Sequence, residues 1–249
     1  MKTGKVMVTG ASGTLGRHIV ESGLFGDIVA PSHSEMDITD ADSVEKFLGE
    51  NQFDTIIHCA AMARMGECEK EPKKAILTNA IGTTHLVTAT IKKEAEEGRK
   101  IRFVHISTDG VYQSTKGNYS EKDETAPYNH YGWTKLGAES AVNLLQNFCI
   151  IRTRFFDPKN IKYDAYATDS YTSMIPANEL AQAIAVVMKS GFVGTINIGG
   201  EKVSDYDAFR KHKPSIRPCK LQDIQSKTPF KLPKDASMKK SLWNRIKAT

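Results

Sequence analysis

Short apolar segments alternate along this chain with segments of helical periodicity, and this alternation limits the folds open to it. Between two such segments, TDADSVEKFLGEN begins with capping residues and places Val44, Phe47 and Leu48 on one helical face. Strands that are apolar throughout need cover on both faces, so the sequence predicts an α/β fold with a doubly wound parallel sheet. The predicted strands are KVMVTG, DIVAPS, DTIIHCAA, IRFVHIST, FCIIRT and GTINIGG.

A glycine-rich loop follows the first predicted strand. In VTGASGTLG, the residues Gly10, Gly13 and Gly16 have the spacing G-x-x-G-x-x-G, a variant of the dinucleotide fingerprint. The first glycine permits a tight turn, the second lets the backbone approach a pyrophosphate, and the third lets the next helix pack closely on the strand. The N–H groups at the start of that helix then face the anion. The loop predicts a Rossmann-type sheet with a dinucleotide site.

The end of the second predicted strand bears on the choice between NAD and NADP. An acidic residue there would bind the ribose hydroxyls, but Ser32 and His33 stand where an acid is expected. Arg17 follows the glycine loop and could meet a 2′-phosphate. We therefore expect NADP(H) to be preferred, with NAD(H) possible. Asp37 either reaches the adenine or caps the helix that begins beside it.

The domain organisation follows from where the alternation weakens. A helix over NELAQAIAVVMKSG, capped by Asn178 and ended by Gly191, and the strand GTINIGG come late in the chain. The segments around them are irregular and offer too few helices for a core of their own. We predict a NAD(P)-binding Rossmann domain over residues 1–155, with parts of 175–200 completing the sheet, and a small substrate-binding lobe over residues 156–249.

A tyrosine and a lysine lie four residues apart at the start of a helix predicted over residues 131–147. Tyr131 and Lys135 therefore share one helical face. The fourth strand ends in ISTDGVY and brings Thr108 to the same carboxyl edge of the sheet. A neighbouring ammonium lowers the pKa of a phenol, and a hydroxyl could hold a substrate oxygen while a nicotinamide supplies or takes hydride. These groups fit the reduction of a ketone or the oxidation of an alcohol.

Other polar residues beside the predicted site have more ordinary interpretations. We expect His58 and His105, in apolar strands, to be core histidines. Asn79 falls within a helix predicted over residues 72–97, where it could bond to backbone near the site. Arg152 and Arg154 follow the fifth strand and could either meet a phosphate or form surface pairs.

Composition and charge exclude several classes of protein. The 249 residues, 40% hydrophobic, suffice for one core, and the sequence shows neither an apolar run of about 20 residues nor a signal peptide. From residue 201 onward, thirteen Lys and Arg face five Asp and Glu, a net of +8, without a nucleic-acid motif. We expect a cytoplasmic protein that binds neither nucleic acid nor membrane. The scattered cysteines favour neither a disulfide framework nor a metal site; they are Cys59, Cys68, Cys149 and Cys219.

Four motifs in order, TGASGTLG, HCAA, STDGVY and YGWTK, resemble those of the extended short-chain dehydrogenases/reductases. Within that superfamily, GTLGR, MDITD, YGWTKLGAE and IIRT make the first 155 residues most similar to the dTDP-4-dehydrorhamnose reductase family. The resemblance implies a catalytic set of Thr108, Tyr131 and Lys135. It implies a cofactor site of Gly10, Ser12, Gly13, Thr14, Leu15, Gly16, Arg17, Ser32, His33, Asp37, Ile38, Cys59, Ala60, Ala61, Tyr131 and Lys135.

The resemblance also implies a substrate and an assembly. It predicts reduction of a nucleoside-diphosphate-linked 4-keto-6-deoxy sugar in dTDP-rhamnose biosynthesis, by a homodimer joined through its two long helices. Dehydration is disfavoured because Gly110, not an acid, follows Asp109. Two alternatives stay open: a sugar-nucleotide epimerase with the same catalytic set, and a non-catalytic regulatory or scaffold subunit that keeps the fold. The segment after IIRTRFFDP is short for the family, which favours the scaffold.

Overall fold

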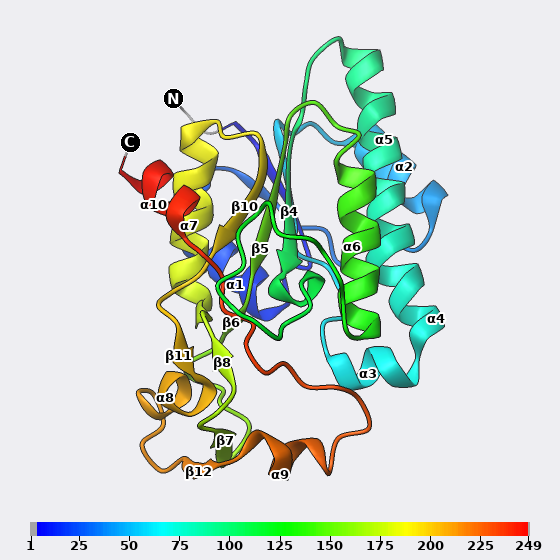
Figure 1. Cartoon of the computed structure of the whole chain (residues 1–249). Coiled ribbons are helices and arrows are strands. Elements are labelled where there is room, and N and C mark those ends of the chain that lie inside the picture. Colours follow the sequence, from blue (N-terminus) through cyan, green and yellow to red (C-terminus); the bar gives the residue numbers. More distant parts are fainter. Residues whose placement is uncertain (1–3, 249) are drawn as a thin grey trace.

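The computed structural model describes residues 4–248. Within that range, six strands form one parallel sheet in the order β10-β5-β4-β3-β1-β2, which confirms the predicted α/β class (Figure 1). The strands of this sheet are β1 (Val6–Thr9), β2 (Ile28–Val29), β3 (Thr55–His58), β4 (Arg102–Thr108), β5 (Phe148–Thr153) and β10 (Gly194–Ile198).

Helices cover both faces of the sheet, as apolar strands require. One face carries α1 (Thr14–Glu21), α7 (Ala177–Ser190) and α10 (Ser241–Lys247), and its core contains Ile19 and Ile184 (Figure 1). The other face carries α2 (Ala41–Glu50), α5 (Gly82–Glu97) and α6 (His130–Val142), and its core contains Leu48 and Leu86. In the described residues, no helix is long and apolar enough to cross a membrane.

Three helices differ from the sequence-based prediction. The helix expected over residues 72–97 consists of α4 (Pro72–Ala75), a π-helical segment η1 (Ile76–Ile81) and α5. The second, α6, ends at Val142 instead of residue 147, because the side chain of Asn143 donates to the backbone oxygen of Glu139 at 2.7 Å. The third, α7, begins one residue before Asn178 with Pro176 as its N-cap, and it ends at Gly191 in the left-handed conformation, as predicted.

A lobe of short elements lies at the carboxyl edge of the sheet, at the bottom of Figure 1. Its strands pair two by two, a regularity that their brief, proline-interrupted sequences did not reveal. The division of the chain at residue 155 stays a prediction. The remaining elements are α3 (Met65–Lys70), η2 (Asp109–Val111), β6 (Phe155–Phe156), β7 (Ala165–Ala167), β8 (Tyr171–Thr172), β9 (Ile175–Pro176), β11 (Val203–Ser204), α8 (Asp205–Arg210), β12 (Arg217–Cys219) and α9 (Leu221–Gln225).

Candidate active site

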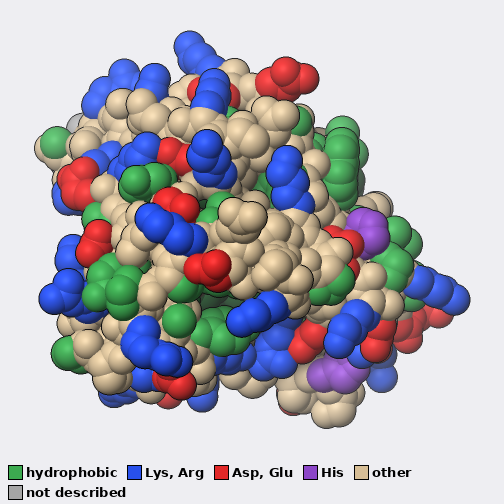
Figure 2. Space-filling view, turned by 60° about the horizontal axis from the view of Figure 1, so that its bottom comes forward, with side chains coloured by type: hydrophobic (Ala, Val, Ile, Leu, Met, Phe, Trp, Pro, Cys, Tyr) green, Lys and Arg blue, Asp and Glu red, His purple; other side chains and the backbone are tan. Residues whose placement is uncertain are grey.

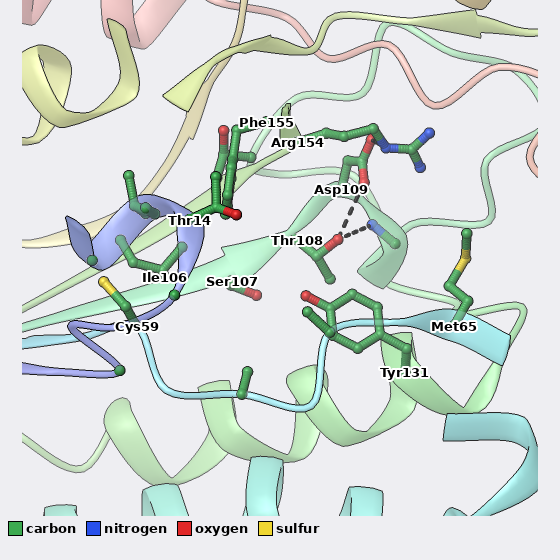
Figure 3. A pocket seen from close by; sticks show the side chains of 18 of the residues that line it. Thr14, Cys59, Met65, Ile106, Ser107, Thr108, Asp109, Tyr131, Arg154 and Phe155 are labelled. Carbon is green, nitrogen blue, oxygen red and sulfur yellow. Dashed lines mark hydrogen bonds and ion pairs between the residues drawn. The ribbon is translucent and has the colours of Figure 1, made fainter. Parts of the chain in front are cut away.

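A cavity of about 420 Å³ opens at the carboxyl edge of the sheet, between the glycine loop and the start of α6. Figure 3 shows Thr14 and Cys59 on one side of it and Thr108 and Tyr131 on the other. Parallel strands deliver their following loops to one edge, which explains why residues so far apart in sequence meet here. The predicted site residues that line the cavity are Gly10, Gly13, Thr14, Leu15, Gly16, Cys59, Ala61, Thr108 and Tyr131.

The glycine loop has the shape of an anion cradle. Gly10 has a φ of 66°, and a Cβ there would lie 2.7 Å from the backbone nitrogen of Ala60. A Cβ on Gly16 would lie 2.2 Å from the carbonyl oxygen of Gly10, so only glycine lets α1 start this close to β1. Gly13 is the N-cap of α1, and the first turn of that helix contains no acidic side chain. These residues fit the pyrophosphate of a dinucleotide.

The residues proposed for the adenosine end lie outside the lining of this cavity. Both the backbone nitrogen and the hydroxyl of Ser32 donate to the Glu35 carboxylate, at 2.8 and 2.7 Å. His33 pairs with Asp37 at 3.7 Å, and Asp37 also accepts from Thr39. The loop therefore contains an acid after all, Glu35, two positions after His33. In the described chain, the predicted residues absent from the lining are Ser12, Arg17, Ser32, His33, Asp37, Ile38, Ala60 and Lys135.

Two glycines set the position of the tyrosine. Asn129 caps α6 by accepting from the backbone nitrogen of Gly132 at 2.8 Å. A Cβ on Gly132 would lie 2.3 Å from the carbonyl oxygen of Gly110, so the first turn of α6 packs directly against η2. Tyr131, in that turn, therefore points its hydroxyl at Thr108, the last residue of β4 (Figure 3).

The electrostatics of the tyrosine differ from the prediction. Burial raises the pKa of Tyr131, and the Asp109 carboxylate raises it further. The charge of Lys135 acts instead on His58 and on Cys59. Burial lowers the pKa of Lys135 itself to about 8, against the opposing effect of Glu139. The expected lowering of the Tyr131 pKa by Lys135 is therefore wrong for this structure, because burial and a neighbouring carboxylate both favour the neutral phenol.

The π-helical segment turns an asparagine toward the site. The side chain of Asn79 accepts from the backbone nitrogen of Met62 at 2.8 Å and donates to its oxygen at 3.0 Å. It also donates to the hydroxyl of Thr134 in α6 at 2.9 Å. The predicted bonding of Asn79 to backbone near the site is confirmed. It ties the loop after β3, which lines the cavity, to α6.

Buried polar groups fill the space beneath the cavity. His58 lies between the hydroxyls of Thr9 and Thr83, at 2.6 and 2.9 Å, which confirms its reading as a core histidine. His105 is also fully buried, and in residues 4–248 neither of its ring nitrogens has a hydrogen-bond partner. Arg152 forms a buried pair with Glu139, whose carboxylate also accepts from Ser107, rather than a surface pair.

A second cavity of about 520 Å³ lies in the lobe. Its wall includes Tyr166, whose ring stacks on that of Phe209 with centroids 4.0 Å apart. Met65 and Arg154 line both cavities, so the two spaces adjoin. Figure 2 shows the lobe face, where Lys and Arg side chains border a hollow lined by hydrophobic ones. The lobe thus encloses a pocket although its sequence is short. No group of three metal-ligating side chains occurs among the described residues.

The fold and site together define a Rossmann-type protein built like the short-chain dehydrogenases/reductases, with a tyrosine and a threonine across one cavity from its glycine loop. The chain belongs to the family described as RmlD substrate binding domain, whose match spans residues 4–188.

Individual relatives agree with this membership. The chain is 35% identical over 190 residues to the dTDP-4-keto-6-deoxy-D-glucose reductase of Streptomyces niveus, a match that covers 74% of this chain and 62% of that protein. A hypothetical dTDP-4-dehydrorhamnose reductase of Sulfolobus tokodaii has a similar structure, with a TM-score of 0.84, 30% identity and coverage of 97% and 94%. The dTDP-4-dehydrorhamnose reductase of Bacillus anthracis, solved in complex with NADP, shares the fold, with a TM-score of 0.85, 24% identity and coverage of 98% and 93%.

Proposed function

We propose that this chain is an NAD(P)H-dependent reductase of a nucleotide-linked 4-keto-6-deoxy sugar. One observation carries the proposal: Tyr131 and Thr108 lie across one cavity from the glycine loop, and this cavity adjoins an aromatic-walled pocket in the lobe. The first cavity suits a nicotinamide and a keto sugar, and the second suits a nucleobase. The names of the relatives, reductases of dTDP-linked keto sugars, support the same substrate class.

Each residue has a role that its environment supports. A bound nicotinamide supplies the hydride. Tyr131 donates its proton to the keto oxygen as that oxygen gains charge, and its raised pKa keeps the phenol protonated, as reduction requires. Thr108 hydrogen-bonds the same oxygen. Lys135, buried one turn further along α6 and outside the described lining of the cavity, would hold the nicotinamide ribose.

For the cofactor, NADP(H) is the preferred form in this proposal and NAD(H) a possible one. Arg17 offers positive charge to a 2′-phosphate, and the NADP complex of the Bacillus anthracis protein supports this assignment. Glu35 has the opposite influence, since a carboxylate repels a phosphate and accepts from ribose hydroxyls. This combination is the reason to keep both cofactors in the proposal.

The proposal extends to organisation, assembly and location. Residues 1–155, with parts of 175–200, would form the cofactor domain and residues 156–249 the substrate lobe, in a cytoplasmic homodimer. The dimer would join the helices α5 and α6 of two copies, because large apolar side chains are exposed on these helices, on η1 and just after α6. These side chains are Ile76, Ile81, Ile91, Trp133 and Leu144.

The test is consumption of NADPH and NADH by the full chain with a panel of nucleotide-linked 4-keto sugars. Tyr131→Phe should reduce kcat by about 10²–10⁴-fold, the usual contribution of a general acid. Tyr171→Phe, at a tyrosine that lines neither cavity, is the matched control and should turn over normally. Turnover that survives Tyr131→Phe would refute the mechanism. Tightly retained NAD would indicate an epimerase. Absence of turnover with every keto sugar of the panel would indicate a non-catalytic subunit.

A further inference from the structure

An ion pair between a buried carboxylate and a partly buried guanidinium lies beside the proposed proton donor. Residues Thr108 and Thr153 are register partners on the adjacent strands β4 and β5, so the residues that follow them, Asp109 and Arg154, come to lie side by side. The guanidinium Nε of Arg154 contacts a carboxylate oxygen of Asp109 at 2.8 Å. Asp109 is only 1% exposed, yet both residues line the catalytic cavity (Figure 3).

The same carboxylate controls the hydroxyl of Thr108. A threonine hydroxyl has one hydrogen and two lone pairs. In Thr108 the hydrogen is donated to Asp109 at 3.2 Å, and one lone pair accepts from the backbone nitrogen of Gly110 at 3.0 Å. The hydroxyl of Tyr131 points toward Thr108 (Figure 3). Asp109 thereby positions the Thr108 hydroxyl, whose hydrogen turns to the keto oxygen when a substrate binds.

The other ionisable groups around the tyrosine contribute less charge. Cys68 in α3 faces Tyr131, but burial raises the pKa of its thiol to about 11, so it is neutral near pH 7. Tyr128 and Asp205 lie near Arg154, and Lys135 acts on groups on the opposite side of the cavity. Asp109 and Arg154 are therefore the charges that decide how readily the Tyr131 phenol ionises.

We propose that Asp109 and Arg154 form a positioning pair for the proton donor. Asp109 orients the Thr108 hydroxyl and keeps Tyr131 a phenol, and Arg154 partly offsets the electrostatic effect of the Asp109 carboxylate on Tyr131. Neither residue transfers a proton or touches the reacting carbon. The inference deepens the proposed reductase and rests on it for its meaning. Its test is a titration that needs no turnover.

Removing one charge of the pair has an effect of predictable sign. Asp109→Asn leaves the Arg154 guanidinium unopposed, and a nearby cation stabilises phenolate, so the Tyr131 pKa falls. Arg154→Gln leaves the Asp109 carboxylate unopposed, so the Tyr131 pKa rises. If the pair did not act on the Tyr131 phenol, the Tyr131 pKa would stay unchanged in both variants.

The experiment places a fluorinated tyrosine at position 131 of the full chain and follows its ¹⁹F NMR resonance against pH. Its more acidic phenol brings the titration into a range where the protein stays folded. We expect shifts of about one pH unit or more, downward in Asp109→Asn and upward in Arg154→Gln. Asp235→Asn removes a different buried carboxylate, paired with Lys202 and lining neither cavity, and should leave the titration unchanged.

Because a lone charge left from a buried pair destabilises the fold, the double variant Asp109→Asn/Arg154→Gln is measured alongside. It should titrate close to the wild type, since both charges are gone together. Shifts of the same sign in the two single variants, or a double variant that departs from the wild type more than either of them, would overturn the proposal. Absence of keto-sugar reduction would overturn the proposed function and leave the titration result standing.

Discussion

Lys135, the proposed ribose-binding residue, illustrates how a buried charge can oppose stability. Its side chain is 1% exposed, and burial lowers its pKa from 10.5 to about 8. Between these two pH values the unfolded chain binds more protons than the folded one, so this residue makes stability rise as pH rises through that interval. Below about pH 8 the folded protein bears the full free-energy cost of burying the charged ammonium, on the order of 3 kcal/mol. A purely structural role would not retain such a cost.

We therefore predict that Lys135→Met raises stability at pH 7 while abolishing turnover. The stabilisation should be about 1–3 kcal/mol, because a methionine fills most of the space without a buried charge. Urea unfolding at pH 7 and pH 10 measures it, and the difference between variant and wild type should shrink at the higher pH. Lys93→Met is the control, since Lys93 is buried but paired with Glu97 at 2.6 Å and its loss should destabilise. A destabilised Lys135→Met would contradict the prediction.

For single residues, spacing in the sequence predicts a role when that role depends only on the residue's own loop or helical turn. Gly10 and Tyr131 were predicted in this way, and both line the cavity. Partners that depend on strand order were not predictable: no local pattern indicates that Arg154 meets Asp109, because the contact requires β4 and β5 to be neighbours in register. Gly132 was missed for the same reason, since its function is to admit the carbonyl of Gly110.

Among the elements, the π-helical segment η1 has the most direct link to the site. Regular helical spacing predicted one helix over residues 72–97, and the widened turn depends on a tertiary contact that periodicity does not contain. Asn79 bonds both backbone groups of Met62, so the turn is fixed by the loop after β3. Similarly, the short lobe strands were unpredicted because a strand of two or three residues has no measurable alternation.

Replacing Asn79 tests this link. Asn79→Ala leaves the backbone nitrogen of Met62 without its partner and leaves the Met62 oxygen only the weak donor Cys68. This loss should cost about 2–3 kcal/mol and lower the melting temperature by about 5–10 °C. Because the loop containing Met62 lines the cavity through its neighbours Ala61 and Ala63, kcat should also fall. Calorimetry and initial rates measure the two effects. Asn160→Ala, at an exposed loop position, should change neither, and an Asn79→Ala protein as stable as the wild type would refute the link.

On the scale of the whole molecule, the proposed function rests on two adjoining cavities that are built differently. The sheet edge supplies rigid backbone and buried polar groups, whereas the lobe supplies aromatic rings held by short strands. Met65 and Arg154 belong to both linings, so a ligand that spans them would contact both parts. A nucleotide-linked sugar has the matching form, with a flat base at one end and the reacting ring at the other.

This division predicts that substrate and cofactor binding can be altered separately. Tyr166→Ala removes the ring that stacks on Phe209 in the lobe cavity, and loss of one stacking surface for a base costs about 1–2 kcal/mol. KM for the nucleotide sugar should rise by about 10-fold, with KM for NADPH unchanged, because Tyr166 is absent from the described lining of the catalytic cavity. Tyr166→Phe keeps the ring and should behave as the wild type. Calorimetric titration of Tyr166→Ala with the free nucleoside diphosphate should show the same loss of affinity. An equal loss of affinity for NADPH would mean that the two cavities do not bind separate ligands.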